Sequence, residues 1–318
     1  MNPAVRQAPI FGCYDRPMER AVGDYRALRE DAGAIDLAGW GILRLRGPDS
    51  RDFLQGMASQ DLAAAAAPRA SQTLFLNEKG RPVALAWVLL QADGAGADVI
   101  TDEGGLAALR PHFERFRIME DVEFEGPDGM PRVVGVAGPA RAERLASLAA
   151  EIPGAREARA EPLSFLLVPR ETATNRLPRF ADPEAVAAWR LAVGLPRGGV
   201  DFDLDRIATE LNLPEALSHT KGCYVGQEVV ARTSNRGQVR RVRIGFRFAW
   251  AGSAIPPRAE IRAGNAVAGY VTSSAPEPGA ANGLGMGYLS TEAIAASEAV
   301  TAVLPGGSVP LTISAWPL

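Results

Sequence analysis

Residues 221–228 read Lys-Gly-Cys-Tyr-Val-Gly-Gln-Glu, and together with His219 and Thr220 they gather the rarest side chains of the chain. Among 318 residues there are only two lysines, two histidines and two cysteines. One of each lies between positions 219 and 223. These side chains have the most versatile acid–base and nucleophilic chemistry. The segment is therefore the first candidate for a functional site.

The residues that follow this segment predict a helix. Good helix formers run from Gln227 to Thr233, and the helix is expected to end near Gly237. Cys223 would then precede a helix N-terminus, where free N–H groups favour a thiolate, and Lys221 would add positive charge. We interpret Cys223 as the chemical group of the protein and Lys221 as its activator. The alternative is a buried structural cysteine, which polar neighbours such as Glu228 disfavour.

The residues around Cys223 do not favour a metal site or a hydrolase active site. The histidine and cysteine of a Cys/His hydrolase usually come from distant segments, whereas His219 is four residues away. Zinc takes about four ligands, and the other cysteine, Cys13, is far away in the sequence. We therefore predict no resident metal site, and we expect Cys223 to supply one ligand or one thiol to something shared.

A run of arginines follows the segment. No acidic residue occurs from 229 to 247, and the arginines are Arg232, Arg236, Arg240, Arg241, Arg243 and Arg247. Two readings stay open: a solvated helix end and strand face, or an anion site beside Cys223 that takes a carboxylate, a phosphate or a partner's acidic surface.

The flanking sequence predicts an α+β body followed by an all-β barrel. A hairpin is expected around Glu78-Lys79-Gly80, and Asp49 or Ser50 is expected to cap a helix. Upstream strands are predicted at 40–46, 73–77, 82–90, 99–101, 122–124, 132–136 and 163–168, with helices after 49, over 106–116, over 139–150 and from 182 to 194. Barrel strands are predicted at 242–248, 260–263, 266–272, 285–289, 299–303 and 311–315.

Composition sets broad limits on the class of protein. The longest nearly continuous apolar run, 83–90, is far short of the ~20 residues that span a bilayer. Residues 1–20 have scattered charges and do not resemble a signal peptide. Two cysteines fit a reducing compartment, and a net charge of −3 is not typical of nucleic-acid binding. We expect a cytoplasmic protein without a membrane partner or direct nucleic-acid partner.

The pattern KGCYxGQE at 221–228 resembles the signature of the YgfZ family, the bacterial folate-binding group related to a mitochondrial iron–sulfur assembly factor. All seven specified positions match. Residues 41–62, 73–81 and 189–196, followed by Glu210 and Asn212, resemble further stretches of that family. The same layout resembles the glycine-cleavage T-protein, a tetrahydrofolate-dependent aminomethyltransferase with a folate-binding α+β body and a C-terminal barrel.

The resemblance implies a folate-binding α+β domain over 1–241, in two subdomains, and a β-barrel domain over 242–318. It implies tetrahydrofolate as cofactor and iron–sulfur client or assembly proteins as partners. A flat pterin favours an aromatic face and a bidentate carboxylate. Trp40 matches a folate-contacting tryptophan of the family, and Trp189 is the nearest match to a second one, displaced by about one helical turn. Glu210 is the expected pterin carboxylate, with Asn212 beside it. The remaining residues expected to bind the cofactor are Tyr224, Gln227, Glu228 and Arg232.

One departure bears on the reaction. The T-protein reaction depends on an aspartate just after the hairpin glycine, whereas residues 81–86 here, Arg-Pro-Val-Ala-Leu-Ala, contain no acid. The main hypothesis is therefore a helper that binds tetrahydrofolate and assists assembly or repair of [4Fe–4S] proteins, including tRNA-modifying enzymes, through Cys223. The alternatives are a one-carbon transferase with a relocated base, revealed by formation of methylene-tetrahydrofolate, and a binding module in which Cys223 is structural. Whether the protein is an enzyme stays open.

Overall fold

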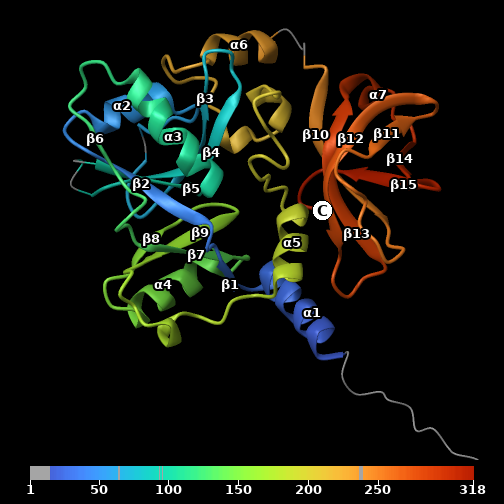
Figure 1. The fold of residues 1–318 in the computed structure, drawn as a ribbon, viewed down its shortest axis with the longest axis horizontal. Helices are drawn as coiled ribbons and strands as arrows, with labels where there is room; N and C mark the ends of the chain where they lie inside the picture. Colours follow the sequence, from blue (N-terminus) through green and yellow to red (C-terminus); the bar gives the residue numbers. More distant parts are fainter. Residues whose placement is uncertain (1–14, 64, 93, 95, 236–238) are drawn as a thin grey trace, which may run out of the picture.

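The computed structural model describes residues 15–63, 65–92, 94, 96–235 and 239–318. In these ranges the chain forms two open β-sheets and a closed barrel, with helices around and between them (Figure 1). All the strand pairs within the two sheets and the barrel are antiparallel. The predicted α+β class with a C-terminal barrel is confirmed.

A five-stranded sheet carries helices on one face, and aromatic side chains fill the space between them. Phe53, Phe75, Phe113 and Phe124 meet there with ring centroids 4.9–5.9 Å apart. The strand order is β3 (Ser71–Leu76), β4 (Pro82–Leu90), β5 (Gly96–Asp102), β2 (Trp40–Arg46) and β6 (Glu123–Glu125), and the helices are α2 (Ser50–Met57) and α3 (Glu103–Phe116).

Side-chain hydrogen bonds explain the hairpin turn and show that one predicted helix cap is absent. Strands β3 and β4 pair around the predicted turn, where Gly80 has φ +67°. The Asn77 side chain accepts the N–H groups of Lys79 and Arg81, which fixes the turn. The predicted side-chain cap of α2 is wrong, because the Asp49 carboxylate instead accepts the N–H of Asp121 at 2.7 Å.

A four-stranded sheet packs against the other face of the first sheet. Trp87 and Phe165 meet between them with ring centroids 5.2 Å apart. The fully buried Asp98 on β5 binds Arg44 of its own sheet and Arg156 of the other, which ties the two together. The order is β1 (Gly33–Asp36), β7 (Arg132–Ala137), β9 (Leu163–Val168) and β8 (Arg156–Ala158), with α4 (Arg141–Glu151) against it.

The C-terminal strands close a barrel, because β10 pairs with both β13 and β15. Apolar residues such as Phe246 and Val271 are fully buried in its core. Its strands are β10 (Arg241–Ala249), β11 (Glu260–Ala263), β12 (Ala266–Pro276), β13 (Asn282–Ser290), β14 (Val300–Leu304) and β15 (Gly307–Ser314), and α7 (Thr291–Ala295) follows β13.

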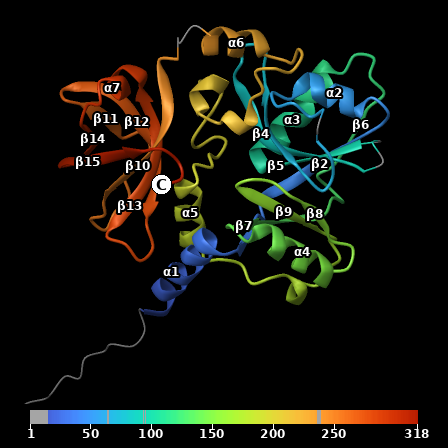
Figure 2. The same cartoon turned by 180° about the vertical axis from the view of Figure 1, so that it is seen from behind.

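Helix α5 (Pro183–Ala192) lies between the sheets and the barrel, beside α1 (Asp15–Glu30), as Figures 1 and 2 show from opposite sides. Its predicted start is confirmed: Asp182 accepts the N–H of Glu184, and Pro183 is the first helical residue. The connection to the barrel contains η2 (Ala208–Leu211), η3 (Pro214–Ala216) and α6 (Gln227–Asn235), while η1 (Thr174–Arg176) precedes α5.

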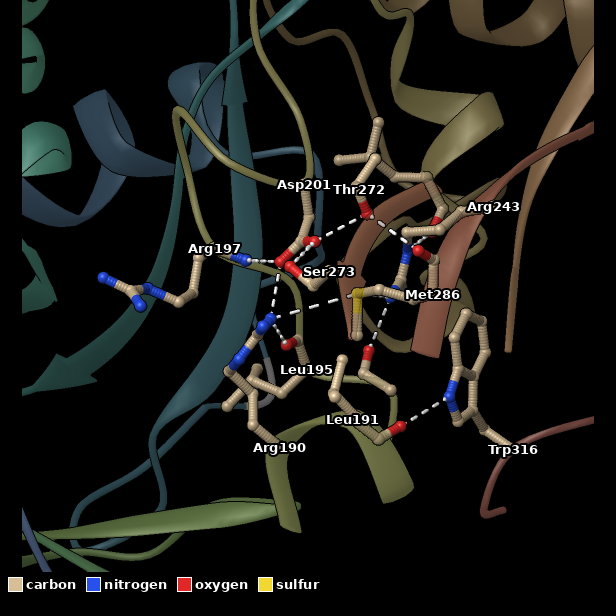
Figure 3. Close-up of polar contacts among 12 residues, drawn as sticks. Arg190, Leu191, Leu195, Arg197, Asp201, Arg243, Thr272, Ser273, Met286 and Trp316 are labelled. Atoms are coloured by element: carbon tan, nitrogen blue, oxygen red, sulfur yellow. Dashed lines mark hydrogen bonds and ion pairs between the residues drawn. The ribbon is translucent and has the colours of Figure 1, made fainter. Parts of the chain in front are cut away.

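A buried ion pair joins this connection to the barrel (Figure 3). Arg190 of α5 donates to the Asp201 carboxylate at 2.5 Å; the Asp201 side chain is fully buried and the Arg190 side chain is 15% exposed. The hydroxyls of Thr272 and Ser273 on β12 donate to the other Asp201 oxygen at 2.7 and 2.6 Å. Burial opposes ionisation of Asp201, but the charge of Arg190 and these hydroxyl groups outweigh it, so the pKa of Asp201 is lowered.

Replacing Asp201 by Asn should lower the free energy of unfolding by about 3–5 kcal/mol, because Arg190 would keep a buried charge without its partner. Urea denaturation at neutral pH measures the change. Asp203→Asn is the control, since that carboxylate is partly exposed: it accepts the N–H of Asp205 at 2.9 Å and lies 3.5 Å from the exposed Arg258.

The same pair predicts a pH dependence. Because the folded pKa of Asp201 is below its usual value, its contribution is fully present above about pH 4 and is lost as pH falls through the folded pKa. The stability difference between wild type and Asp201→Asn should therefore shrink in acid. A difference that is constant from pH 7 to the acid transition would contradict this assignment.

Candidate functional site

A cavity of about 570 Å³ lies where the two sheets meet α5. Its wall includes three tryptophans from separate elements: Trp40 begins β2, Trp87 lies in β4 and Trp189 lies in α5. Trp40 is partly exposed, whereas Trp87 and Trp189 are buried. The structure thus brings the two predicted folate-contacting tryptophans, Trp40 and Trp189, to one cavity.

A carboxylate lies next to Trp40 in this wall. Trp40 on β2 is directly opposite Asp102 on β5, and such cross-strand partners have Cβ atoms ~5 Å apart. Asp102 Oδ1 accepts the N–H of Gly105 at 2.8 Å and caps α3. Sequence analysis missed Asp102 as a site residue.

Other charged side chains surround the cavity. Asp36 and Glu103 are exposed acids in its wall, and Arg197 is an exposed base at the loop that follows α5. Arg197 gives its backbone N–H to Asp201, and Figure 3 shows its guanidinium pointing away from that carboxylate. The wall therefore combines aromatic faces with acids and one outward arginine.

The indole N–H of Trp87 is a buried donor in this region. In the described part of the chain it has no hydrogen-bond partner. A buried donor without a partner costs about 1–3 kcal/mol relative to a satisfied one. An acceptor that reached this N–H would recover this energy.

The signature residues 221–228 form a separate site, and Lys221 fixes its shape. Lys221 is only 8% exposed, and its ammonium donates to the carbonyls of Gln55, Ala58 and Gln60 at 2.7, 2.7 and 3.1 Å. These carbonyls lie at the C-terminal end of α2, where the helix dipole favours a cation. Burial lowers the pKa of Lys221 to about 8, and the charge of Asp61 opposes this shift.

This arrangement corrects the expected role of Lys221. All three ammonium protons have carbonyl acceptors, so the side chain is a structural anchor rather than a free activator of the thiol. Its ammonium also lies 5.2 Å from the ring centroid of the buried Tyr224. A compact charge with three donors suits this site, which explains why lysine occurs here in an arginine-rich chain.

Gly226 brings the signature loop against the β3–β4 hairpin. It has φ +83°, and a side chain there would place its Cβ 2.6 Å from the carbonyl oxygen of Asn77. The backbone N–H of Val225 also bonds to the carbonyl of Gly56 in α2. The loop is therefore held between α2 and the hairpin.

Cys223 is exposed on this loop, four residues before α6 begins at Gln227. The predicted helix after the signature is confirmed. Within the ranges that the structure describes, no three His, Cys, Asp or Glu residues are grouped to hold a metal. The other cysteine, Cys13, lies outside the described residues. The thiol is thus accessible and can offer one ligand or one nucleophile.

The remaining predicted cofactor residues do not line the cavity. Glu210 accepts the N–H of Ile207 at 3.3 Å and lies 3.5 Å from Arg206, so it closes the η2 turn. Asn212 donates to the carbonyl of Arg243. Tyr224 and Gln227 belong to the signature loop and the start of α6, where the exposed Glu228 pairs with Arg232.

The arginines of the run that the structure describes are engaged separately rather than gathered in one anion site. Arg232 pairs with Glu228, Arg247 pairs with Glu277, and Arg243 is fully buried. Arg236 lies outside the described residues, and Arg240 and Arg241 lead into β10. Glu277 reaches Arg247 from another strand, Glu228 precedes Arg232 in the same helix, and Arg243 donates to backbone carbonyls.

The chain is similar to known proteins over most of its length. Residues 241–318 match the family model described as the glycine cleavage T-protein C-terminal barrel domain. The iron–sulfur cluster assembly factor IBA57 of Homo sapiens is 31% identical over 67% of this chain, and the tRNA-modifying protein YgfZ of Yersinia pestis (strain Pestoides F) is 27% identical over 65%. The alignments cover 65% and 68% of those proteins, so the chain matches just under two thirds of the human relative.

The fold is also found in a solved structure. The aminomethyltransferase T of the glycine cleavage system from Bartonella henselae superposes with a TM-score of 0.78, at 18% identity, over 93% of this chain and 89% of that one. At this identity the likeness concerns the fold alone.

Lys221→Arg should loosen the signature loop although the charge is kept, because a planar guanidinium cannot reach three converging carbonyls. We expect a loss of about 1–3 kcal/mol in stability and faster hydrogen exchange at residues 218–226. Urea denaturation and exchange measured by mass spectrometry test this. Lys79→Arg, at the other, exposed lysine, is the matched control, and equal behaviour of the two variants would refute the anchor.

Proposed function

Since this chain belongs to the YgfZ and IBA57 family, within the superfamily of the glycine-cleavage T-protein, we propose that it assists the assembly or repair of iron–sulfur proteins. The clients are [4Fe–4S] proteins, including tRNA-modifying enzymes, and the chemical group is Cys223. The observation that carries the proposal is an exposed thiol on a loop that a buried lysine holds in place. The names of the human and Yersinia relatives support the same role.

The thiol chemistry follows from the isolation of Cys223. A thiolate is a strong ligand for iron, and a single thiolate cannot hold a cubane cluster that takes four. Cys223 would therefore act together with ligands of a client, as a transient ligand of the cluster or of incoming iron. The fixed loop keeps the sulfur exposed while its backbone groups are hydrogen-bonded to α2. The proposal places this activity in the cytoplasm.

Tetrahydrofolate is the proposed ligand of the tryptophan cavity. Pockets of 300–1,000 Å³ with aromatic walls and few polar groups are typical of such ligands, and this one has about 570 Å³. Trp40 and Trp189 would contact the ring system, Asp102 would accept its paired N–H donors, and the free Trp87 N–H would meet an acceptor. Bound tetrahydrofolate supplies a carrier for one-carbon units. These residues fit the ligand, with Asp102 in the role expected for Glu210.

A folate-dependent one-carbon transferase is the second candidate, and Asp102 is the observation that favours it. Residues 81–86 carry no acid at the position used by the T-protein, but Asp102 places a carboxylate in the cavity. In this candidate Asp102 would bind a substrate amine through Oδ2, because Oδ1 caps α3, and it would not hold both pterin donors. Formation of methylene-tetrahydrofolate from an aminomethyl or N-methyl donor separates this candidate from the first.

Trp40→Ala should weaken tetrahydrofolate binding by about 1–3 kcal/mol, the scale of a lost stacking surface. Asp102→Asn should weaken it similarly, because the amide replaces one of the two acceptor oxygens by an NH₂ group, which would face a pterin N–H donor. Calorimetry under anaerobic conditions measures both affinities. Glu210→Gln is the control and should bind tetrahydrofolate as the wild type does. A large loss of affinity in Glu210→Gln with none in Asp102→Asn would show that Glu210, and not Asp102, binds the pterin.

Cys223→Ser should abolish support of [4Fe–4S] enzymes while it preserves the fold and most of the folate affinity. Serine has a similar size, but it stays protonated at neutral pH and is a poor ligand for iron. The measurement is the activity of [4Fe–4S] enzymes in cells that lack their own copy, beside the melting temperature of each variant. Cys13→Ser should be nearly silent, and wild-type activity with Cys223→Ser would overturn the thiol mechanism.

A further inference from the structure

One arginine in the wall of the tryptophan cavity has a charge that its own chain does not neutralise. Arg197 is exposed, and Figure 3 shows its guanidinium pointing away from Asp201. Within the ranges that the structure describes, its side chain takes part in no ion pair. The acids of the loop that follows pair with other arginines; they are Asp201, Asp203 and Asp205. An arginine in this state at the edge of a cavity is a candidate to bind an anionic group of a ligand.

The backbone of Arg197 is fixed from both sides. Its N–H donates to Asp201 Oδ2 at 2.9 Å, and its carbonyl accepts the backbone N–H of Asp201 at 2.8 Å. The Asp201 carboxylate is itself fully buried and paired with Arg190. The Cα of Arg197 therefore has a defined position, while its side chain remains exposed. A bound anion would have to order only this side chain, which keeps the entropic cost of binding small.

The loop after α5 brings Arg197 to the acidic edge of the cavity. A Cβ on the neighbouring Gly198 would lie 3.6 Å from Asp102 Oδ2, so the loop and the start of α3 meet in the wall. The exposed acids of the wall, Asp36 and Glu103, would repel an anionic group. Arg197 is the exposed cation among the residues that line the cavity. The position of an anionic group on the ligand is therefore narrowed to the side of Arg197.

We propose that Arg197 binds a carboxylate of the glutamate tail of tetrahydrofolate and thereby orients this ligand in the cavity. The inference rests on the proposed binding of tetrahydrofolate and names the residue that distinguishes it from a pterin without a tail. The flat ring would lie among the tryptophans, of which Trp87 and Trp189 are buried, and the tail would lie at the exposed loop after α5. Carboxylates keep part of their hydration at such an exposed edge, so their binding there costs little desolvation.

The chemistry of the guanidinium suits this role. Its planar fork can hold a carboxylate through two parallel N–H···O bonds, which fixes the direction of the tail as well as its charge. An anion on Arg197 would also offset the repulsion between Arg197 and the nearby Arg190. Burial is the main cause that lowers the pKa of Arg190, and the charge of Arg197 acts in the same direction. Binding of the tail would therefore strengthen the junction that holds the loop.

The test compares Arg197→Gln with Arg170→Gln, which removes the same charge from an exposed arginine beyond the end of β9 opposite the lining residue Leu163. Calorimetry under anaerobic conditions measures the affinity for tetrahydrofolate and for 6-methyl-tetrahydropterin, which has the ring but no carboxylate. Arg197→Gln should weaken tetrahydrofolate binding about fivefold at low salt, and the loss should shrink in about 0.5 M salt, because the pair is exposed. Its affinity for 6-methyl-tetrahydropterin and its melting temperature should equal those of the wild type. Arg170→Gln should bind both ligands as the wild type does.

Three results would overturn the proposal. The first is unchanged tetrahydrofolate affinity in Arg197→Gln while Trp40→Ala binds weakly, which leaves the proposed ligand and its cavity in place. The second is an equal loss of affinity for tetrahydrofolate and for 6-methyl-tetrahydropterin, which would place Arg197 at the ring and not at the tail. The third is an equal loss in Arg197→Gln and Arg170→Gln, which would show a general effect of net charge. A wild-type chain that does not bind tetrahydrofolate would instead remove the proposed ligand itself, and this inference with it.

Discussion

The hydrogen bonds accepted by the buried Asp201 carboxylate are the interaction that holds the sheets, α5 and the barrel in their arrangement. It accepts the side chain of Arg190, the backbone N–H of Arg197 and two hydroxyls of β12 (Figure 3). One acid thereby fixes α5, the loop that follows it and a barrel strand relative to one another. Because Leu195 to Gly198 line the tryptophan cavity, the same bonds also set the shape of its wall. The ion pair is costly to bury, and its four donors are what offset that cost.

Arg243 shows how the barrel strand depends on the same junction. It is fully buried and donates to the carbonyls of Gly194 and Leu211 rather than to an acid. Its guanidinium carbon lies 4.3 Å from the ring centroid of Trp316, whose own N–H bonds to the carbonyl of Leu191. The backbone carbonyls at the end of α5 and in the turn that follows it therefore accept hydrogen bonds from side chains of the C-terminal region. Burial lowers the pKa of Arg243 to about 10, which leaves it charged at neutral pH.

Sequence analysis predicted most of the regular elements, because their apolar patterns and caps are local. Strand β2 and strand β9 were predicted with their observed bounds, and Asp182 marked the start of α5. It missed α1, which is largely polar, and the short strands β1, which pairs with the distant β7, and β8, which has only three residues. The cavity could not be predicted from the sequence either. Trp40, Asp102 and Trp189 are brought together only when two sheets and a helix pack against one another. The lysine of the signature was recognised as special, but its carbonyl acceptors come from another segment.

Strand β4 and its hairpin are the elements that the two sites share. Leu85 and Trp87 belong to the cavity wall, while the hairpin turn at Gly80 packs against Val229 and Gly226 beside the signature loop. Cys223 does not line the cavity, so a bound folate would affect the thiol through the protein and not by direct contact. Backbone pairing with β3 and β5 makes β4 a stiff connection between the two. The same hairpin is joined to α3 by the ion pair of Arg115 and Glu78, so the cavity, the signature loop and α3 all contact one rigid element. A change in any of them that moves this hairpin would be felt by the other two.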